Sequence, residues 1–148
     1  MPKFCANLGF LFTERPFLDR FAASAKAGFS AVEYSDPYAY ETSQLVDLLG
    51  ENGLLQALLN MPAGDWAAGE RGIACLPDRQ SEFQDGVGRA ITYAQALGCP
   101  LVNCLAGIKP ASLSTEQAWE TLVENLRFAG REVHRAGLTL LVEPINSF

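Results

Sequence analysis

The chain has 148 residues and a formal net charge of −6 at pH 7; 49% of its residues are hydrophobic and 19% are charged. This composition is typical of one compact globular domain and excludes a disordered chain. The negative charge disfavours nucleic acid as a partner, because phosphates are attracted to basic surfaces. No run approaches the roughly 18 apolar residues of a membrane span, and the first residues lack the features of a signal peptide. We therefore expect a cytoplasmic protein with neither a membrane nor a nucleic-acid partner.

One unit recurs along the chain: a short apolar strand, a polar loop, an amphipathic helix and a glycine that ends the helix. The predicted strands cover residues 3–8, 31–35, 54–60, 101–106 and 138–143. The predicted helices cover residues 16–27, 41–51, 81–97 and 114–135. The last helix opens on Ser114 with Gln117 three residues later, which is the pattern of a capping box.

Strands that are apolar on both faces and alternate with helices predict a parallel sheet covered by helices. Right-handed crossovers leave two architectures, an open doubly wound sheet or a closed barrel. The loop at residues 9–16 has neither a G-x-G-x-x-G nor a Walker A pattern, which favours the barrel. A (β/α)₈ TIM barrel takes about 250 residues. We therefore predict an α/β chain whose residues 1–148 form a single domain, the N-terminal part of such a barrel, truncated to about four and a half β/α units with parallel strands.

Active sites of these barrels lie at the carboxyl ends of the strands. Five polar residues are expected there: Asn7, Glu33, Asn60, Asn103 and Glu143. Glu143 ends an apolar strand and precedes a proline, and a carboxylate in that position needs a partner. The partner can be a neighbouring cation in a salt bridge or a divalent metal, for which Mg²⁺ or Mn²⁺ suits an oxygen ligand.

Five segments, taken in chain order, resemble hydroxypyruvate isomerases, a family within the xylose-isomerase-like TIM barrel superfamily. The segments are Phe-Ser-Ala-Val-Glu-Tyr at 29–34, the loop Asn-Met-Pro-Ala-Gly-Asp-Trp-Ala-Ala-Gly-Glu-Arg-Gly-Ile-Ala-Cys at 60–75, Val-Asn-Cys-Leu at 102–105, Val-Glu-Asn-Leu-Arg-Phe-Ala at 123–129 and Leu-Val-Glu-Pro-Ile-Asn at 141–146. The loop at 60–75 is the most specific of these, whereas the Val-Glu-Pro motif is shared across the superfamily.

The resemblance implies interconversion of hydroxypyruvate and 2-hydroxy-3-oxopropanoate by metal-assisted proton transfer through an enediolate. It implies a divalent metal, Mg²⁺ or Mn²⁺, held by carboxylates, and two glutamates that move the proton. Glu143 matches the first glutamate, both as metal ligand and as acid/base. The second glutamate and the other ligands lie on later strands of the family, so the metal shell is expected to be incomplete in this chain.

Hydroxypyruvate carries a carboxylate, so a substrate-binding cation is expected. Arg71 in the long loop is the first candidate and Lys109 the second, although each can equally be a solvated loop charge. Asn7, Asn60 and Asn103 are candidates to hydrogen-bond substrate oxygens, or alternatively to cap strand ends.

Two alternatives remain. One is a catalytically inactive half-barrel that self-associates, because open sheet edges recruit other chains; a homo-oligomer through those edges is expected. The other is a metal-dependent endonuclease of the same superfamily. That alternative is disfavoured because it requires a histidine-rich zinc cluster, and the chain contains one histidine, His134.

Overall fold

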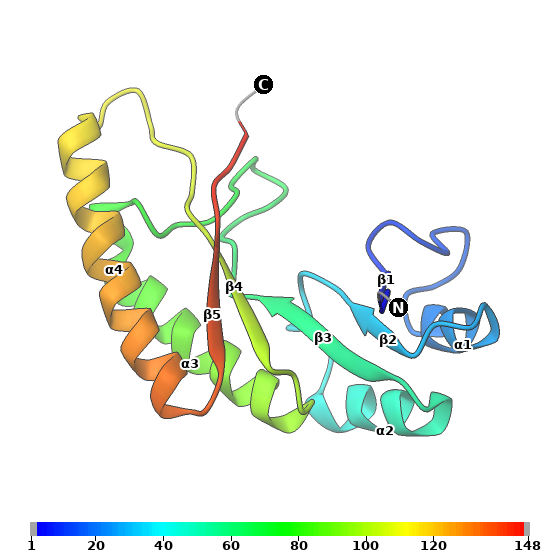
Figure 1. Cartoon of the computed structure of the whole chain (residues 1–148). Coiled ribbons are helices and arrows are strands. Elements are labelled where there is room, and N and C mark those ends of the chain that lie inside the picture. The colour runs from blue at the N-terminus through cyan, green and yellow to red at the C-terminus, as the bar shows by residue number, and fades with distance from the viewer. Residues whose placement is uncertain (1–2, 147–148) are drawn as a thin grey trace.

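The computed structural model describes residues 3–146 and has the predicted strand–helix repeat (Figure 1). All strands pair in parallel, in the sheet order β1-β2-β3-β4-β5. The strands are β1 (Ala6–Asn7), β2 (Ala31–Glu33), β3 (Leu55–Asn60), β4 (Leu101–Leu105) and β5 (Thr139–Glu143). Sequential order with parallel pairing is the arrangement of a TIM barrel and not of a doubly wound sheet, whose strand order reverses. The predicted fold class is therefore confirmed.

The loops that follow the strands gather at one end of the sheet, and the helix-to-strand connections lie at the other end (Figure 1). The helices lie along one side of the sheet. They are α1 (Asp19–Lys26), α2 (Thr42–Asn52), α3 (Gln80–Ala96) and α4 (Thr115–Arg135), with a 3₁₀-helix η1 (Pro77–Arg79) before α3. Helix α4 begins with the predicted capping box between Ser114 and Gln117. Within residues 3–146, no helix is long and apolar enough to cross a membrane.

The N-terminal elements are shorter than the sequence predicts. Among residues 3–146, strand β1 pairs on one side only, with β2, and regular pairing is limited to Ala6 and Asn7 instead of residues 3–8. Helix α1 begins at Asp19 and not at Pro16, because the residues before it form turns in which Asp19 N–H donates to the Pro16 carbonyl at 3.0 Å. The 3₁₀-helix at Pro77–Arg79 has no counterpart in the sequence prediction.

The hydrophobic core lies between the sheet and the helices. Phe21 of α1, Leu45 of α2 and Val87 of α3 are buried there against strand residues such as Leu59 and Val102. Near α1, the rings of Phe17, Phe21 and Tyr34 pack edge to face, and Tyr40 stacks on Phe17. This packing fixes the helices against the sheet and leaves the other face of the strands free to form a cavity.

A β-bulge interrupts the pairing of β2 with β3. Val32 is opposite Gln56, but the next residue, Glu33, is opposite Leu58, so β3 contains one extra residue. The buried Gln56 side chain donates from Nε2 to the Leu58 carbonyl at 2.7 Å and so satisfies a main-chain group beside the bulge. Because side chains alternate between the two faces of a strand, the extra residue reverses which residues of β3 face the helices.

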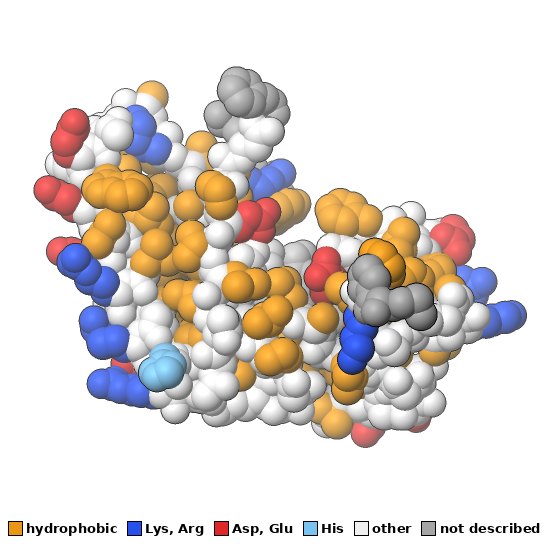
Figure 2. All heavy atoms as spheres, viewed as in Figure 1, with side chains coloured by type: hydrophobic (Ala, Val, Ile, Leu, Met, Phe, Trp, Pro, Cys, Tyr) orange, Lys and Arg blue, Asp and Glu red, His pale blue; other side chains and the backbone are white. Residues whose placement is uncertain are grey.

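Hydrophobic side chains remain exposed at the β5 end of the sheet, where they gather over α4 and β5 (Figure 2). Trp119 on α4 is 65% exposed and Val142 on β5 is 49% exposed. Partly buried leucines accompany them, namely Leu122, Leu126 and Leu140. In the described part of the chain β5 pairs only with β4, so its other edge is open. We call this surface, formed by the five residues named here, the β5 face.

Candidate active site

An open cavity of about 800 Å³ lies at the carboxyl ends of the strands. Its lining includes all five polar residues that the sequence places at strand ends: Asn7, Glu33, Asn60, Asn103 and Glu143. Trp66, from the loop after β3, also lines it. Side chains from β1 to β5 therefore converge on one cavity, as expected for the mouth of a barrel.

Asn60, Asn103 and Glu143 form a hydrogen-bonded chain across three neighbouring strands. Asn60 and Asn103 are register partners, and the Asn103 Nδ2 donates to Asn60 Oδ1 at 3.1 Å. The same Nδ2 donates to Glu143 Oε2 at 2.6 Å. Both asparagines are buried, whereas Glu143 is exposed at the rim. A buried amide thus holds one oxygen of the Glu143 carboxylate and leaves the other oxygen available.

A second pair, Asn7 and Glu33, lies on β1 and β2. Asn7 Nδ2 donates to Glu33 Oε1 at 3.0 Å, and Asn7 Oδ1 accepts the Gly9 N–H at 2.9 Å. The Cys5 thiol lies 3.5 Å from Glu33 Oε2. Burial, and next the negative charge of Glu33, raise the pKa of the Cys5 thiol, so it stays protonated at neutral pH.

Arg71 stacks on Trp66, with its guanidinium carbon 3.7 Å from the ring centroid. It donates to the Trp66 carbonyl at 3.1 Å and to the Glu70 carbonyl at 2.7 Å. Arg71 and Glu143 line the same opening at the rim, beside Trp66. The structure therefore brings this predicted cation close to the predicted base.

The loop that carries Trp66 and Arg71 is fixed against the end of β4. Gly72 has φ +99° and lies so close to Leu105 that an added Cβ would be 2.3 Å from the Leu105 carbonyl oxygen. The Asn125 side chain on α4 donates to the Ala74 carbonyl at 2.9 Å. These anchors were not identified from the sequence, although the three glycines within residues 64–72 are a signal of unusual backbone conformation.

Lys109 is placed differently from Arg71. Its Nζ donates to the carbonyls of Leu113 at 2.9 Å and Pro110 at 3.4 Å, within its own loop. It is not among the residues that line the cavity or the opening beside Arg71. The structure thus assigns Lys109 a loop contact and brings only Arg71 to the rim.

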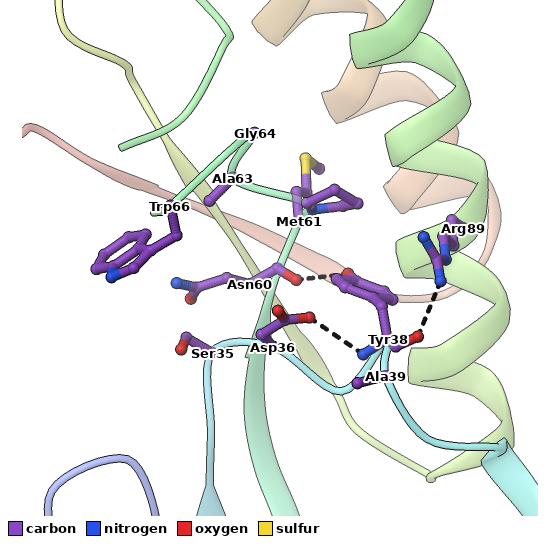
Figure 3. A pocket seen from close by; sticks show the side chains of 11 residues that line it. Ser35, Asp36, Tyr38, Ala39, Asn60, Met61, Ala63, Gly64, Trp66 and Arg89 are labelled. Carbon is purple, nitrogen blue, oxygen red and sulfur yellow. Dashed lines mark hydrogen bonds between the residues drawn. The ribbon is translucent and has the colours of Figure 1, made fainter. Parts of the chain in front are cut away.

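A smaller pocket adjoins the cavity on the α3 side of β3 (Figure 3). The Tyr38 hydroxyl donates to the Asn60 carbonyl at 2.5 Å, and Arg89 of α3 donates to the Tyr38 carbonyl at 3.0 Å. The Asn60 side chain points the other way, toward Trp66 (Figure 3). Asn60 is therefore held at its main chain by Tyr38 and at its side chain by Asn103. The sequence did not reveal this role of Tyr38.

The donor set for a metal ion is partial. Residues 3–146 bring no group of three or more His, Cys, Asp and Glu side chains together. Glu143 contributes one carboxylate, next to two amide groups. His134 is exposed in the last turn of α4, away from the strand ends. The described residues therefore fit one edge of a divalent-cation site and do not form a whole one.

Parallel strand–helix repeats with convergent polar side chains at the strand ends define a TIM-barrel protein with an enzyme-like site. The sequence model of the xylose isomerase-like TIM barrel family matches residues 21–148, and the chain belongs to that family. It is 53% identical over its whole length to hydroxypyruvate isomerase from Escherichia coli and 46% identical over 99% of its length to 2-oxo-tetronate isomerase from Cupriavidus necator. These relatives confirm the resemblance found in the sequence.

The chain spans about half the length of these relatives, 57% of the first and 56% of the second. A solved structure described as an AP endonuclease of family 2 from Brucella melitensis superposes with a TM-score of 0.95 at 44% identity, over 99% of this chain and 57% of that chain. The 3-keto-D-glucoside 4-epimerase YcjR from E. coli, at 15% identity and a TM-score of 0.76, shares the fold.

Proposed function

We propose that this chain carries the N-terminal half of an isomerase site that interconverts hydroxypyruvate and 2-hydroxy-3-oxopropanoate. The observation that carries the proposal is the position of Glu143, whose carboxylate lines the cavity and is held by the Asn103 amide at 2.6 Å. Identity to named hydroxypyruvate and 2-oxo-tetronate isomerases supports the same substrate class, short hydroxylated keto acids.

The reaction moves a proton between adjacent carbons, one of which bears a hydroxyl and the other a carbonyl. In the proposed mechanism Glu143 removes the proton from the hydroxyl-bearing carbon, which gives an enediolate, and returns it to the neighbouring carbon, while the hydroxyl proton passes to the oxygen of the former carbonyl. Asn103 keeps the carboxylate oriented toward the cavity, and Arg71 pairs with the carboxylate of the substrate at the rim. Asn60 and Asn103 have buried amides within reach of substrate oxygens.

We also propose that Glu143 is one ligand of a bound Mg²⁺ or Mn²⁺ ion. Such an ion would stabilise negative charge on the oxygens of the reacting carbons. Residues 3–146 bring no group of three or more acidic, histidine or cysteine side chains together, so Glu143 would need further ligands beside it to hold the ion. The steps assigned to Glu143, Asn103 and Arg71 do not depend on that ion.

The test is isomerisation of hydroxypyruvate by the chain, with Mg²⁺ or Mn²⁺ added. Glu143→Gln should reduce turnover by at least about 100-fold, because it removes the proton-transferring group. Glu120→Gln, on the exposed surface of α4, is the matched control and should retain full turnover. Turnover that survives Glu143→Gln contradicts the proposal, and absence of turnover in the unmodified chain favours the second candidate below.

The second candidate is a catalytically inactive half-barrel that pairs with another copy of itself. The β5 face favours it, because an open strand edge beside exposed Trp119 and Val142 is a surface that other chains can cover. Light scattering coupled to size-exclusion chromatography should then give at least a dimer. Val142→Lys should shift it to a monomer, whereas Val46→Lys, on the surface of α2, should not. A stable monomer of the unmodified chain at high concentration contradicts this candidate.

A further inference from the structure

Glu33 is the one carboxylate of the cavity lining that the proposed mechanism does not use. Its Oε1 accepts the Asn7 amide, whereas its Oε2 accepts only the Cys5 thiol, a weak donor, at 3.5 Å. None of the ion pairs formed by residues 3–146 includes Glu33. A partly buried carboxylate that has no paired cation, and one oxygen of which holds only a weak thiol donor, is a strong acceptor for a hydroxyl group.

The separation of Glu33 and Glu143 limits the length of a substrate that can bind between them. β2 and β5 are three strands apart in the sheet, roughly 14 Å along its curved surface at about 4.8 Å per strand. Both side chains line the same cavity, and inward projection shortens the distance between their carboxylates. The cavity of about 800 Å³ has room for a chain of a few carbons with one end near Glu33.

The charges around the cavity determine which end of the substrate lies near Glu33. The cavity lining contains two carboxylates, Glu33 and Glu143, and no lysine or arginine. Arg71 lies instead at the adjoining opening, beside Glu143. An anionic substrate therefore places its carboxylate toward Arg71, where the charges attract, and its uncharged hydroxylated end toward Glu33.

We propose that Glu33, held by Asn7, is a specificity residue that binds the hydroxyl at the end of the substrate distant from its carboxylate. This inference rests on the proposed function, because it takes a short keto acid as the ligand. It makes the Glu33 side of the cavity a subsite for hydroxylated chains longer than three carbons. Asn7 acts by fixing the orientation of the Glu33 carboxylate through its own bond to Gly9.

A matched pair of ligands tests the subsite without any need for turnover. 4-Hydroxy-2-oxobutanoate and 2-oxobutanoate differ only in the terminal hydroxyl. Titration of the ¹⁵N-labelled chain, followed by NMR through the indole N–H of Trp66, gives both dissociation constants. The indole of Trp119, exposed on α4, serves as an internal reference that should not shift. We expect the hydroxylated ligand to bind about tenfold more tightly, which is the scale of one hydrogen bond to a charged group.

Glu33→Ala should abolish that preference while the affinity for 2-oxobutanoate stays unchanged, and Glu120→Ala should preserve it. If the alanine variant loses its dispersed spectrum, Glu33→Met keeps the length of the side chain without an acceptor and should give the same result. Equal binding of the two ligands by the unmodified chain, or a preference that survives at Glu33→Ala and Glu33→Met, overturns the inference alone. Failure of both ligands to bind the unmodified chain overturns the proposed substrate class as well.

Discussion

At the scale of single residues, one buried amide organises the site. Asn103 has a single Nδ2 that serves two acceptors, Asn60 and Glu143, on the strands to either side. The arrangement couples the orientation of an exposed carboxylate to the interior of the sheet. It also means that stability and site geometry depend on the same hydrogen bonds.

Asn103→Ala should therefore lower the free energy of unfolding by about 2 kcal/mol, because it leaves the buried Asn60 Oδ1 without a donor. Urea unfolding followed by circular dichroism measures the change. Gln44→Ala, on the exposed surface of α2, is the control and should change the free energy by less than about 0.5 kcal/mol. Equal effects of the two substitutions would show that the Asn60–Asn103 hydrogen bond contributes no stability.

The sequence predicted which polar residues meet at the cavity, but not how they bond. Strand ends can be recognised from apolar runs, and the parallel fold brings those ends together, so Asn7, Glu33, Asn60, Asn103 and Glu143 could all be selected. The hydrogen bonds depend on register and side-chain rotamer, which no local pattern encodes. Lys109 illustrates the limit, since its loop turns back and its amine donates to main-chain carbonyls.

At the scale of elements, the loop between β3 and α3 is anchored by several contacts beside the site. Its backbone is held by Gly72 N–H, which donates to the Ala63 carbonyl at 2.8 Å, and by an ion pair between Glu70 and Arg79. Within the loop, Ile73, Ala74 and Cys75 are buried. The resemblance of residues 60–75 to the isomerase family identified this loop, but its anchoring depends on contacts with β4 and α4 that are remote in sequence.

Substitution of two glycines in this loop distinguishes the cost of backbone strain from the cost of a steric clash. Gly72→Ala should cost about 3 kcal/mol or more, because it adds a Cβ against the Leu105 carbonyl to the strain of a positive φ. Gly69→Ala, at φ +93° with open space around it, should cost only about 1 kcal/mol. Thermal unfolding of both variants measures the difference. Similar shifts in Tm for both would contradict the close approach of loop and strand.

At the scale of the whole molecule, burial of ionisable groups makes the free energy of unfolding depend on pH in the alkaline range. Burial raises the pKa of the Cys104 thiol from 9.0 to about 12, and it also raises the pKa values of Cys75, Cys99, Tyr34 and Tyr38. An unfolded chain ionises these groups first. The stability is therefore complete below pH 9 and is lost as the pH rises toward 12.

Urea unfolding at pH 7.5, 9.0, 10.0 and 11.0 should show this loss, with a slope of up to about 1.4 kcal/mol per pH unit for each group that titrates. Cys104→Ala should reduce the slope by removing one such group, even though it lowers stability at neutral pH. A free energy of unfolding that is constant or increases between pH 9 and 11 would contradict the burial of these thiols and phenols.

The bulge in β3 has a consequence for how this half-barrel tolerates change. Before it, Gln56 faces the helices; after it, Leu59 does so and Asn60 is released to the mouth. Deletion of one residue from this strand would swap the faces to which Leu59 and Asn60 point. The Asn60 amide would then enter the hydrophobic core, and Leu59 would enter the cavity where the keto acid is proposed to bind. Length here is as constrained as composition, and insertions or deletions should be confined to the opposite end of the strand, near Gly53.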